Sequence, residues 1–185
     1  MGAGATSKRR PNMLMRLAQV HESGQIAAVL RRAFSEFEPL YTPRAYALTT
    51  PKPAQVQRRW TEGPVWVAVL HDRIAGTVSA VPSGDSLYIR SMAVLPAAQG
   101  CGMGRSLLEQ VERFAREKSF RRMRLSTTPF LLAAIQLYQS SGFTKNAEGP
   151  HDLAGTPLFT MEKPIVPLQK RENENEKLPG KIDVR

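Results

Sequence analysis

MAVLPAAQGCGMGRSLL, residues 92–108, is the segment from which the arrangement of the chain is best inferred. The β-forming run 87–95 predicts a strand, and the apolar periodicity of 102–119 predicts an amphipathic helix. A glycine-rich turn joins them. The first turn of a helix has unpaired N–H groups and a positive dipole end, and glycines let an anion approach the backbone. The segment therefore predicts an anion cradle, to which Arg105 adds charge.

The glycine turn differs from two common nucleotide-binding loops. It lacks the Gly-Lys-Ser/Thr ending of a P-loop, so nucleotide hydrolysis is disfavoured. The GxGxxG spacing is absent too, because Gly100-Cys101-Gly102 is followed by Met103-Gly104-Arg105. A tight turn at a helix start that holds no ligand is the alternative interpretation.

Strand and helix patterns alternate on both sides of this segment. β-Forming runs predict strands over residues 13–20, 65–71, 74–81, 87–95, 123–127, 143–147 and 158–163. Apolar periodicity predicts helices over residues 22–37, 54–60, 102–119 and 129–140, and the last of these has Pro129 in its first turn. The Pro-rich passage 39–53 is too broken for a long helix. Short turns join three strands into a meander, so we expect a mixed α/β domain rather than an all-parallel one.

Two further blocks place the glycine turn in a family context. Val94-Leu95-Pro96, two spacers, and then Gln99, Gly102 and Gly104 resemble the coenzyme motif of the GNAT superfamily of N-acetyltransferases. Residues 134–143 resemble the family's later helix with its Leu-Tyr and Gly-Phe ending. Residues 155–163 look like the family's last strand. The resemblance covers residues 13–163.

The resemblance implies a fold and a domain division. The fold is a mixed α/β one, with a central, mostly antiparallel sheet of six to seven strands, splayed middle strands, and about four flanking helices. We expect a flexible basic N-terminus over residues 1–11 and a GNAT acetyltransferase domain over 12–165. The charged segment 166–185 lacks apolar periodicity, so we expect a disordered tail there.

The resemblance also implies an activity. This is the transfer of an acetyl group from acetyl-coenzyme A to a primary amine of a small molecule or peptide, by direct attack on the thioester. The coenzyme-binding residues that it implies are Met92, Ala93 and Val94, through their backbone, and Gln99, Gly100, Cys101, Gly102, Met103, Gly104 and Arg105. The alternative function is a coenzyme-binding module without catalysis, such as a sensor or regulator.

Proton transfer is only partly assigned by the resemblance. Tyr138 stands where the family's proton-donating tyrosine lies, and its alternative role is aromatic packing on a helix face. Some relatives carry a glutamate and an asparagine where this chain has Ser126 and Leu131, so the base is unassigned. The titratable candidates are Asp85, Glu36, Glu38, His151, Asp152 and His71. A water relay is a further alternative. A nucleophilic role for Cys101 is disfavoured by its position beside an expected phosphate.

The acceptor pocket is expected to form from the first helices and the Pro-rich passage. The aromatic residues there are Phe34, Phe37, Tyr41, Tyr46 and Trp60, and ordinary core packing is the alternative role for them, above all for Phe34. No pattern among them selects one amine.

The composition limits which other classes of protein the chain can belong to. The chain has 185 residues, of which 42% are hydrophobic and 23% charged, as in an ordinary globular domain. One cysteine excludes an internal disulfide and a thiolate metal cluster, so we expect no metal. There is no apolar run of about 18 residues and no apolar signal core, so we expect no membrane span and a cytoplasmic location. The formal net charge of +10 suggests nucleic acid as a possible partner class, but the sequence contains no nucleic-acid-recognition motif that supports it. A homodimer is compatible with these features.

Overall fold

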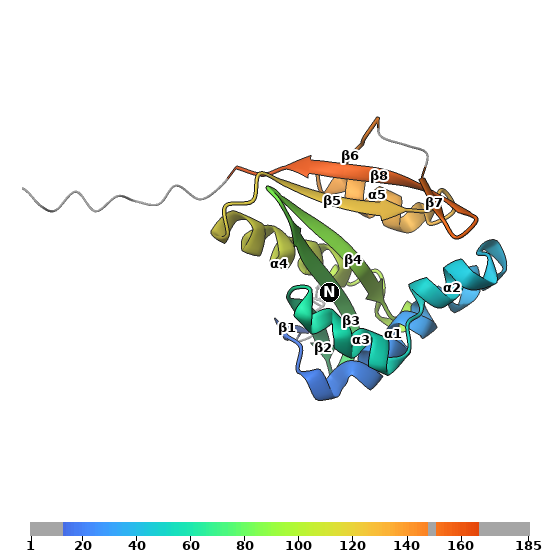
Figure 1. Cartoon of the computed structure of the whole chain (residues 1–185). Coiled ribbons are helices and arrows are strands. Elements are labelled where there is room, and N and C mark those ends of the chain that lie inside the picture. The colour runs from blue at the N-terminus through green and yellow to red at the C-terminus, as the bar shows by residue number, and fades with distance from the viewer. Residues whose placement is uncertain (1–12, 148–150, 167–185) are drawn as a thin grey trace, which may run out of the picture.

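The computed structural model describes residues 13–147 and 151–166 of the chain (Figure 1). Its strands are β1 Met13–Leu17, β2 Val65–Leu70, β3 Arg73–Ser83, β4 Ser86–Val94, β5 Arg122–Thr127, β6 Thr144–Lys145, β7 His151–Leu153 and β8 Thr156–Pro164. Its α-helices are α1 Ser23–Phe34, α2 Pro43–Thr49, α3 Pro53–Arg58, α4 Met103–Glu117 and α5 Leu132–Ser140. Short 3-10 helices connect several of these elements.

The strands form one sheet in the order β1-β2-β3-β4-β5-β8-β6, and β7 pairs with β8. Only β4 and β5 run parallel among the pairs of this order, and all the others are antiparallel. The β2–β3 turn holds His71 and Asp72 at positive φ (48° and 59°), as a tight hairpin requires. The β3–β4 turn uses Gly84 at φ 59°.

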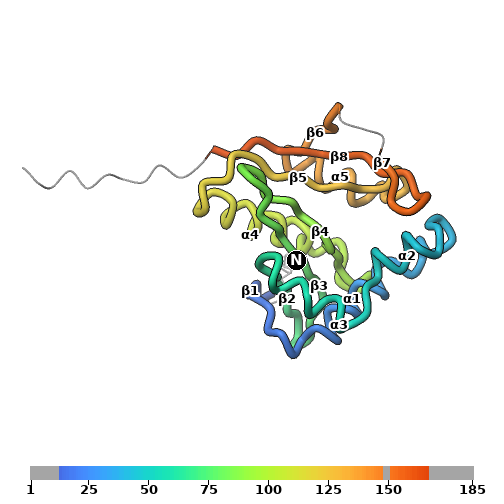
Figure 2. The backbone as a smooth tube through the Cα atoms, viewed as in Figure 1, coloured from blue at the N-terminus to red at the C-terminus, as the bar shows by residue number. Residues whose placement is uncertain are grey.

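The two middle strands separate part of the way along their length. β4 and β5 pair from Ser86↔Arg122 to Ile89↔Leu125 and no further. Beyond Ile89, a bulge against β3 places Ser91 and Met92 opposite a single residue, and Ser91 has φ 54°. Bulges bend the strand and increase its twist. Figure 2 shows the two traces starting together and diverging toward α2.

Helices cover both faces of the sheet. Between the sheet and α4 lies one apolar cluster that includes Leu87, Leu107 and Val111. The opposite face carries α1 and α3 over a second cluster that includes Leu30 and Val56. In Figure 1, α1 and α3 lie on the side of the sheet away from α4.

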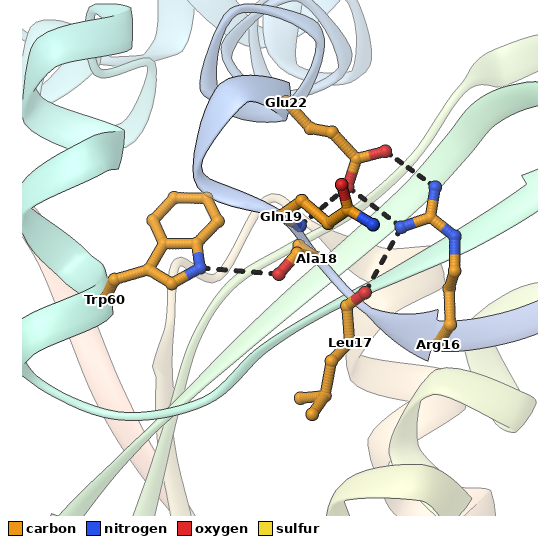
Figure 3. A network of polar contacts seen from close by, with 6 residues as sticks. All are labelled: Arg16, Leu17, Ala18, Gln19, Glu22 and Trp60. Carbon is orange, nitrogen blue, oxygen red and sulfur yellow. Dashed lines mark hydrogen bonds and ion pairs between the residues drawn. The ribbon is translucent and has the colours of Figure 1, made fainter.

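A polar network fixes the start of α1 against the first strand (Figure 3). The buried carboxylate of Glu22 accepts two bonds from the Arg16 guanidinium, at 2.6 and 2.9 Å. It also accepts a bond from the Gln19 backbone N–H at 2.7 Å. The Trp60 indole donates to the Ala18 carbonyl at 3.4 Å, which ties the segment after α3 to the same corner.

The predicted mixed, mostly antiparallel sheet with splayed middle strands is confirmed, and some details differ from the sequence interpretation. The structure adds β7 and α2. The latter is a short helix capped by Thr42 and started by Pro43, inside the Pro-rich passage. The helix expected from Pro129 begins instead at Leu132, because the Leu131 backbone (φ −83°, ψ 61°) lies outside the helical region.

Several expectations concern parts of the chain that the structure leaves out. The basic N-terminus 1–11 lies outside the described residues. So does the charged tail, apart from residue 166. Within the described residues, no helix has the length and apolar character needed to cross a membrane.

Candidate active site

The glycine turn between β4 and α4 is an open cradle of backbone donors. Gly100 and Gly102 have φ 78° and 87°, and a Cβ on either would meet nothing within 4 Å. Among the described residues, the backbone amides of residues 100–105 donate to no acceptor that the structure assigns. They lie at the start of the 15-residue helix α4, where the dipole favours an anion. These are the features that a pyrophosphate requires.

Gly104 has a different role from the other two glycines. A Cβ at this position would lie 2.8 Å from Leu137 Cδ2 and 3.7 Å from Met92 Cε. The distance to Met92 is an ordinary contact, whereas the distance to Leu137 is too short, so the missing side chain lets α4 approach α5 closely. This contact brings Leu137, the residue before Tyr138, against the start of α4 beside the glycine turn.

Two polar side chains hold the loop to the strand that precedes it. The Gln99 amide donates to the Val94 carbonyl at 3.3 Å, and the Cys101 thiol donates to the Ala98 carbonyl at 3.0 Å. Both side chains thus brace the backbone. This placement agrees with a structural role for Cys101.

The last two residues expected in the loop differ in exposure. The Met103 side chain is buried in the core beneath the sheet, so only its backbone faces the loop. Arg105 is exposed and donates to the Ser140 hydroxyl on α5 at 3.3 Å. Its guanidinium is therefore directed toward α5 in this structure.

The strand residues Met92, Ala93 and Val94 border the opening between β4 and β5. One edge of this segment pairs with β3 through Thr77↔Ala93 and Gly76↔Val94. Beyond Ile89, the other edge has no strand partner among the described residues. The Val94 carbonyl accepts the bond from the Gln99 amide, and the backbone groups of this edge that have no partner can bind an extended ligand arm in the manner of an added strand.

Tyr138 lies where three distant parts of the chain converge. It is buried on α5, with its ring centroid 6.0 Å from that of Phe143. Burial raises its pKa above the ordinary value for tyrosine, and interactions with Tyr41 and Tyr88 raise it further. The phenol therefore keeps its proton at neutral pH. The sequence did not indicate Tyr88 as a site residue. The only signal for it is its place on a strand, where it faces away from the buried side.

A polar cleft of about 560 Å³ begins beside Tyr88. It opens on the side of β4, β5 and β8 that faces away from α4, because Tyr88 alternates along β4 with the core residues Leu87 and Ile89. The lining residues are Ser83, Asp85, Ser86, Tyr88, Arg122, Arg124, Ser126, His151 and Thr160. Tyr88 thus connects this cleft to the surroundings of Tyr138.

Two of the base candidates line the cleft, namely Asp85 and His151. A hydrogen bond from Arg122 lowers the pKa of Asp85, which makes this carboxylate a weak base. Ser126, at the position of the relatives' glutamate, also lines the cleft, and its hydroxyl lies 3.5 Å from that of Thr160. The position therefore faces the cleft but carries no carboxylate.

The remaining base candidates lie elsewhere. The Asp152 carboxylate accepts a bond from the Gly155 N–H in the β7–β8 turn. His71 is in the β2–β3 turn, and Glu36 is exposed in the 3-10 helix after α1. Glu38 interacts with Tyr46. None of these four is among the residues that line the cleft.

The aromatic residues expected around the acceptor divide into two groups. Tyr41 lies 4.9 Å from Phe130 and 6.2 Å from Tyr46, and Phe37 lies 6.4 Å from Phe130, all between ring centroids. They form one wall, which Phe130 joins although the sequence did not indicate it. In contrast, Phe34 packs against the core under α1, and Trp60 belongs to the corner in Figure 3.

No group of three or more potential metal ligands from His, Cys, Asp and Glu occurs within residues 13–147 and 151–166. The polar groups of the site are hydroxyls, guanidiniums and backbone amides.

Comparison with known proteins gives this geometry a family context. A family model described as "Acetyltransferase (GNAT) family" matches residues 29–143, which is more than half of the chain. The uncharacterized N-acetyltransferase YjgM of Escherichia coli is 28% identical over 136 residues, covering 70% of this chain and 81% of that protein. Human N-acetyltransferase 8B is 33% identical over 89 residues, which cover 45% of this chain and 39% of that protein.

Solved structures agree on the architecture. The PaiA N-acetyltransferase from Thermoplasma acidophilum, crystallised in complex with coenzyme A, superposes with a TM-score of 0.69. The match covers 83% of this chain and 99% of that one, at 15% sequence identity. At this identity the similarity establishes the fold.

Proposed function

Because the chain belongs to the acetyltransferase (GNAT) family, we propose that it transfers an acetyl group from acetyl-coenzyme A to a primary amine of a small molecule or peptide. One observation carries the proposal: the open amide cradle at α4 lies at the end of the same strand whose free edge borders the opening beside Tyr138. A donor with a polyphosphate head and an extended arm fits this arrangement.

The donor is held chiefly by backbone groups. The amides of residues 100–105 bind the pyrophosphate, with Arg105 adding charge at the rim. The free edge of Met92, Ala93 and Val94 binds the pantetheine arm and offers an N–H to the thioester oxygen, which stabilises negative charge as it develops there. Gln99 and Cys101 brace the loop in the required shape.

The acceptor enters from the polar cleft. Its nitrogen loses a proton to a base in the cleft, either the His151 imidazole or a water molecule held by the polar lining. A C–N bond forms at the thioester carbon and the C–S bond then breaks, which leaves a thiolate. Tyr138 donates its phenolic hydrogen to that sulfur. Burial raises the pKa of this phenol, and the same dry environment makes the thiolate more basic, so donor and acceptor remain matched.

One observation favours a second candidate function, a coenzyme-binding module without catalysis. Ser126 faces the cleft where some relatives carry a glutamate, and Asp85, the carboxylate in the cleft lining, is paired with Arg122. A site without a strong base can bind the coenzyme and still fail to activate an amine.

A coenzyme A release assay tests the proposal. Acetyl-coenzyme A is supplied with a panel of amino acids, polyamines, aminoalkyl phosphates and peptides, and coenzyme binding is measured in parallel by calorimetry. Release with at least one acceptor supports the enzyme. Binding without release from any acceptor favours the module, and the absence of binding refutes both functions.

A further inference from the structure

The segment that leads into β2 carries two arginines to one point on β4. The Arg59 side chain, from the 3-10 helix Arg59–Thr61, donates to the Ser91 hydroxyl at the bulge. Arg90, the residue before Ser91, is paired with Glu62. Two guanidiniums thus lie beside the point where β4 leaves β5. Among the described residues, Arg90 is paired with the Glu62 carboxylate, whereas Arg59 has an ion pair with none.

This arrangement is electrostatically incomplete. Burial lowers the pKa of Arg59 to about 10, and repulsion by Arg90 contributes to the lowering. The Arg90 Nε atom is buried and has no hydrogen-bond partner within the described part of the chain. A half-buried pair of like charges with an unused donor is costly unless an anion completes it.

The position of the pair relates it to the acceptor rather than to the coenzyme phosphates. Arg90 follows Tyr88 by two residues, so both side chains leave the same face of β4. That face carries the polar cleft, and the amide cradle lies at the start of α4 on the other side of the sheet. Ser91, which Arg59 contacts, directly precedes Met92 at the opening between the strands.

We propose that Arg59 and Arg90 form an anion-binding subsite for the acceptor, so that the preferred substrate is an amine that also carries a carboxylate or phosphate group. This inference rests on the proposed acetyl transfer and names its substrate class. The guanidinium of Arg59 and the free Nε–H of Arg90 bind the anionic group of the substrate. The amine of the same molecule then lies toward Tyr88 and the opening.

The test compares acceptors in matched pairs. Each α-amino acid is assayed against its amide, and each aminoalkyl phosphate against the corresponding amino alcohol. We expect kcat/KM to favour the anionic member by roughly tenfold or more, since hydrogen bonds between charged groups are the strong ones. The pair that shows the larger preference distinguishes a carboxylate from a phosphate.

Variants connect this preference to the subsite. Arg59→Gln should remove most of the preference by raising KM for the anionic member, whereas Arg59→Lys should retain part of it. The matched control is Arg58→Gln, which removes one positive charge from an exposed neighbouring residue that is not part of the Arg59–Arg90 pair. Equal rates for both members of every pair would overturn the proposal. So would an Arg59→Gln variant that slows anionic and neutral acceptors alike, because that pattern indicates a structural role.

A binding measurement tests the subsite even if no acceptor is turned over. The Arg90 Nε–H resonance, identified by its absence in Arg90→Lys, is followed by NMR while inorganic phosphate or glycine is added at millimolar concentrations. A saturable shift that Arg59→Gln abolishes supports the subsite although acetyl transfer has failed. The absence of any shift refutes the subsite, whatever the outcome of the activity assays.

Discussion

Among single residues, three tyrosines that are far apart in the sequence share one environment. Tyr41 precedes α2, Tyr88 lies on β4 and Tyr138 lies on α5, and both of the others raise the pKa of Tyr138. Tyr41 and Tyr138 are both buried, and burial is the main cause of the raised pKa of each phenol. A buried, protonated phenol beside an opening in a sheet is suited to donate a hydrogen bond to a leaving group.

Tyr138→Phe tests this role. We expect kcat to fall by roughly 10²-fold or more, as is typical when a general acid is lost, while coenzyme affinity stays the same. Turnover is measured by coenzyme A release and affinity by calorimetry. Tyr46→Phe is the comparison variant, because it keeps the ring in the aromatic wall and removes only a hydroxyl that interacts with Glu38. An unchanged kcat in Tyr138→Phe would remove this residue from the mechanism.

Gly102 is important for its backbone conformation rather than for contacts with neighbouring residues. Its φ of 87° disfavours any side chain, although a Cβ would have open space around it. Gly102→Ala should therefore destabilise the protein by about 1–2 kcal/mol and weaken coenzyme binding, because the loop can relax only by turning its amides away. Thermal unfolding and calorimetry measure the two effects.

The control for Gly102→Ala is Gly24→Ala in α1. Gly24 also has open space around its Cβ position but has no left-handed φ, so alanine should stabilise the helix slightly. If the two variants had the same stability and coenzyme affinity, the conformational argument for Gly102 would be wrong.

Among secondary-structure elements, the junction of β1 and α1 depends on one buried carboxylate. The Arg16 hydrogen bonds lower the pKa of Glu22, with a further contribution from the Gln19 N–H. Because the pKa of this carboxylate is lower in the folded protein than in the unfolded chain, its ionised form stabilises the fold at pH values above the unfolded-state pKa of about 4.3. That stabilisation is lost as the pH falls through the lower folded-state pKa.

Glu22→Gln should remove this pH-dependent contribution to the free energy of unfolding. At neutral pH we expect a loss of roughly 1–2 kcal/mol in the free energy of unfolding, because two charge-assisted bonds are lost and Arg16 is partly solvated. Below about pH 4 the variant and the natural protein should approach each other in stability. Urea unfolding at several pH values measures both effects. The exposed Glu36→Gln is the control, and a Glu22→Gln difference that persists in acid would contradict the ion-pair explanation.

At the scale of the whole molecule, the C-terminal hairpin is joined to a helix more than a hundred residues earlier. The Thr42 N–H donates to the Thr156 hydroxyl at 3.0 Å, and the Thr42 hydroxyl donates to the Ala154 carbonyl at 2.7 Å. Figure 1 shows α2 beside the β7–β8 hairpin at the open end of the two diverging strands. This connection fixes the start of α2, which carries Tyr46 of the aromatic wall, against the hairpin that carries His151.

Thr156→Val should loosen that connection without altering the coenzyme loop. Thr156 is buried, and valine keeps its shape while removing the acceptor for Thr42. We expect KM for the acceptor to rise by about fivefold or more and coenzyme affinity to stay unchanged, since one buried hydrogen bond typically contributes about 1 kcal/mol. Thr144→Val on the exposed strand β6 is the control. A rise in the Kd for the coenzyme, without a rise in KM for the acceptor, would contradict this explanation.

The sequence alone determined the features that depend on neighbours along the chain. Apolar periodicity located α1, α4 and the meander of β2, β3 and β4, and the glycine pattern located the loop at residues 99–104. These signals are local because a helix or strand buries one face at a fixed repeat. They were weakest where an element exists only through its partner, as for β7, which forms by pairing with β8.

Only the tertiary structure decided how distant residues meet. The insertion of β5 between β4 and β8 builds the polar cleft, and β4 separates from β5 after Ile89, one residue beyond Tyr88, which interacts with Tyr138. The packing of α4 on α5 gives Gly104 a role in close contact, although the sequence suggested the same role as for its neighbours. The approach of Arg59 to Ser91 likewise crosses 32 positions of sequence. Such contacts follow from strand order and helix packing, and no pattern of neighbouring residues encodes them.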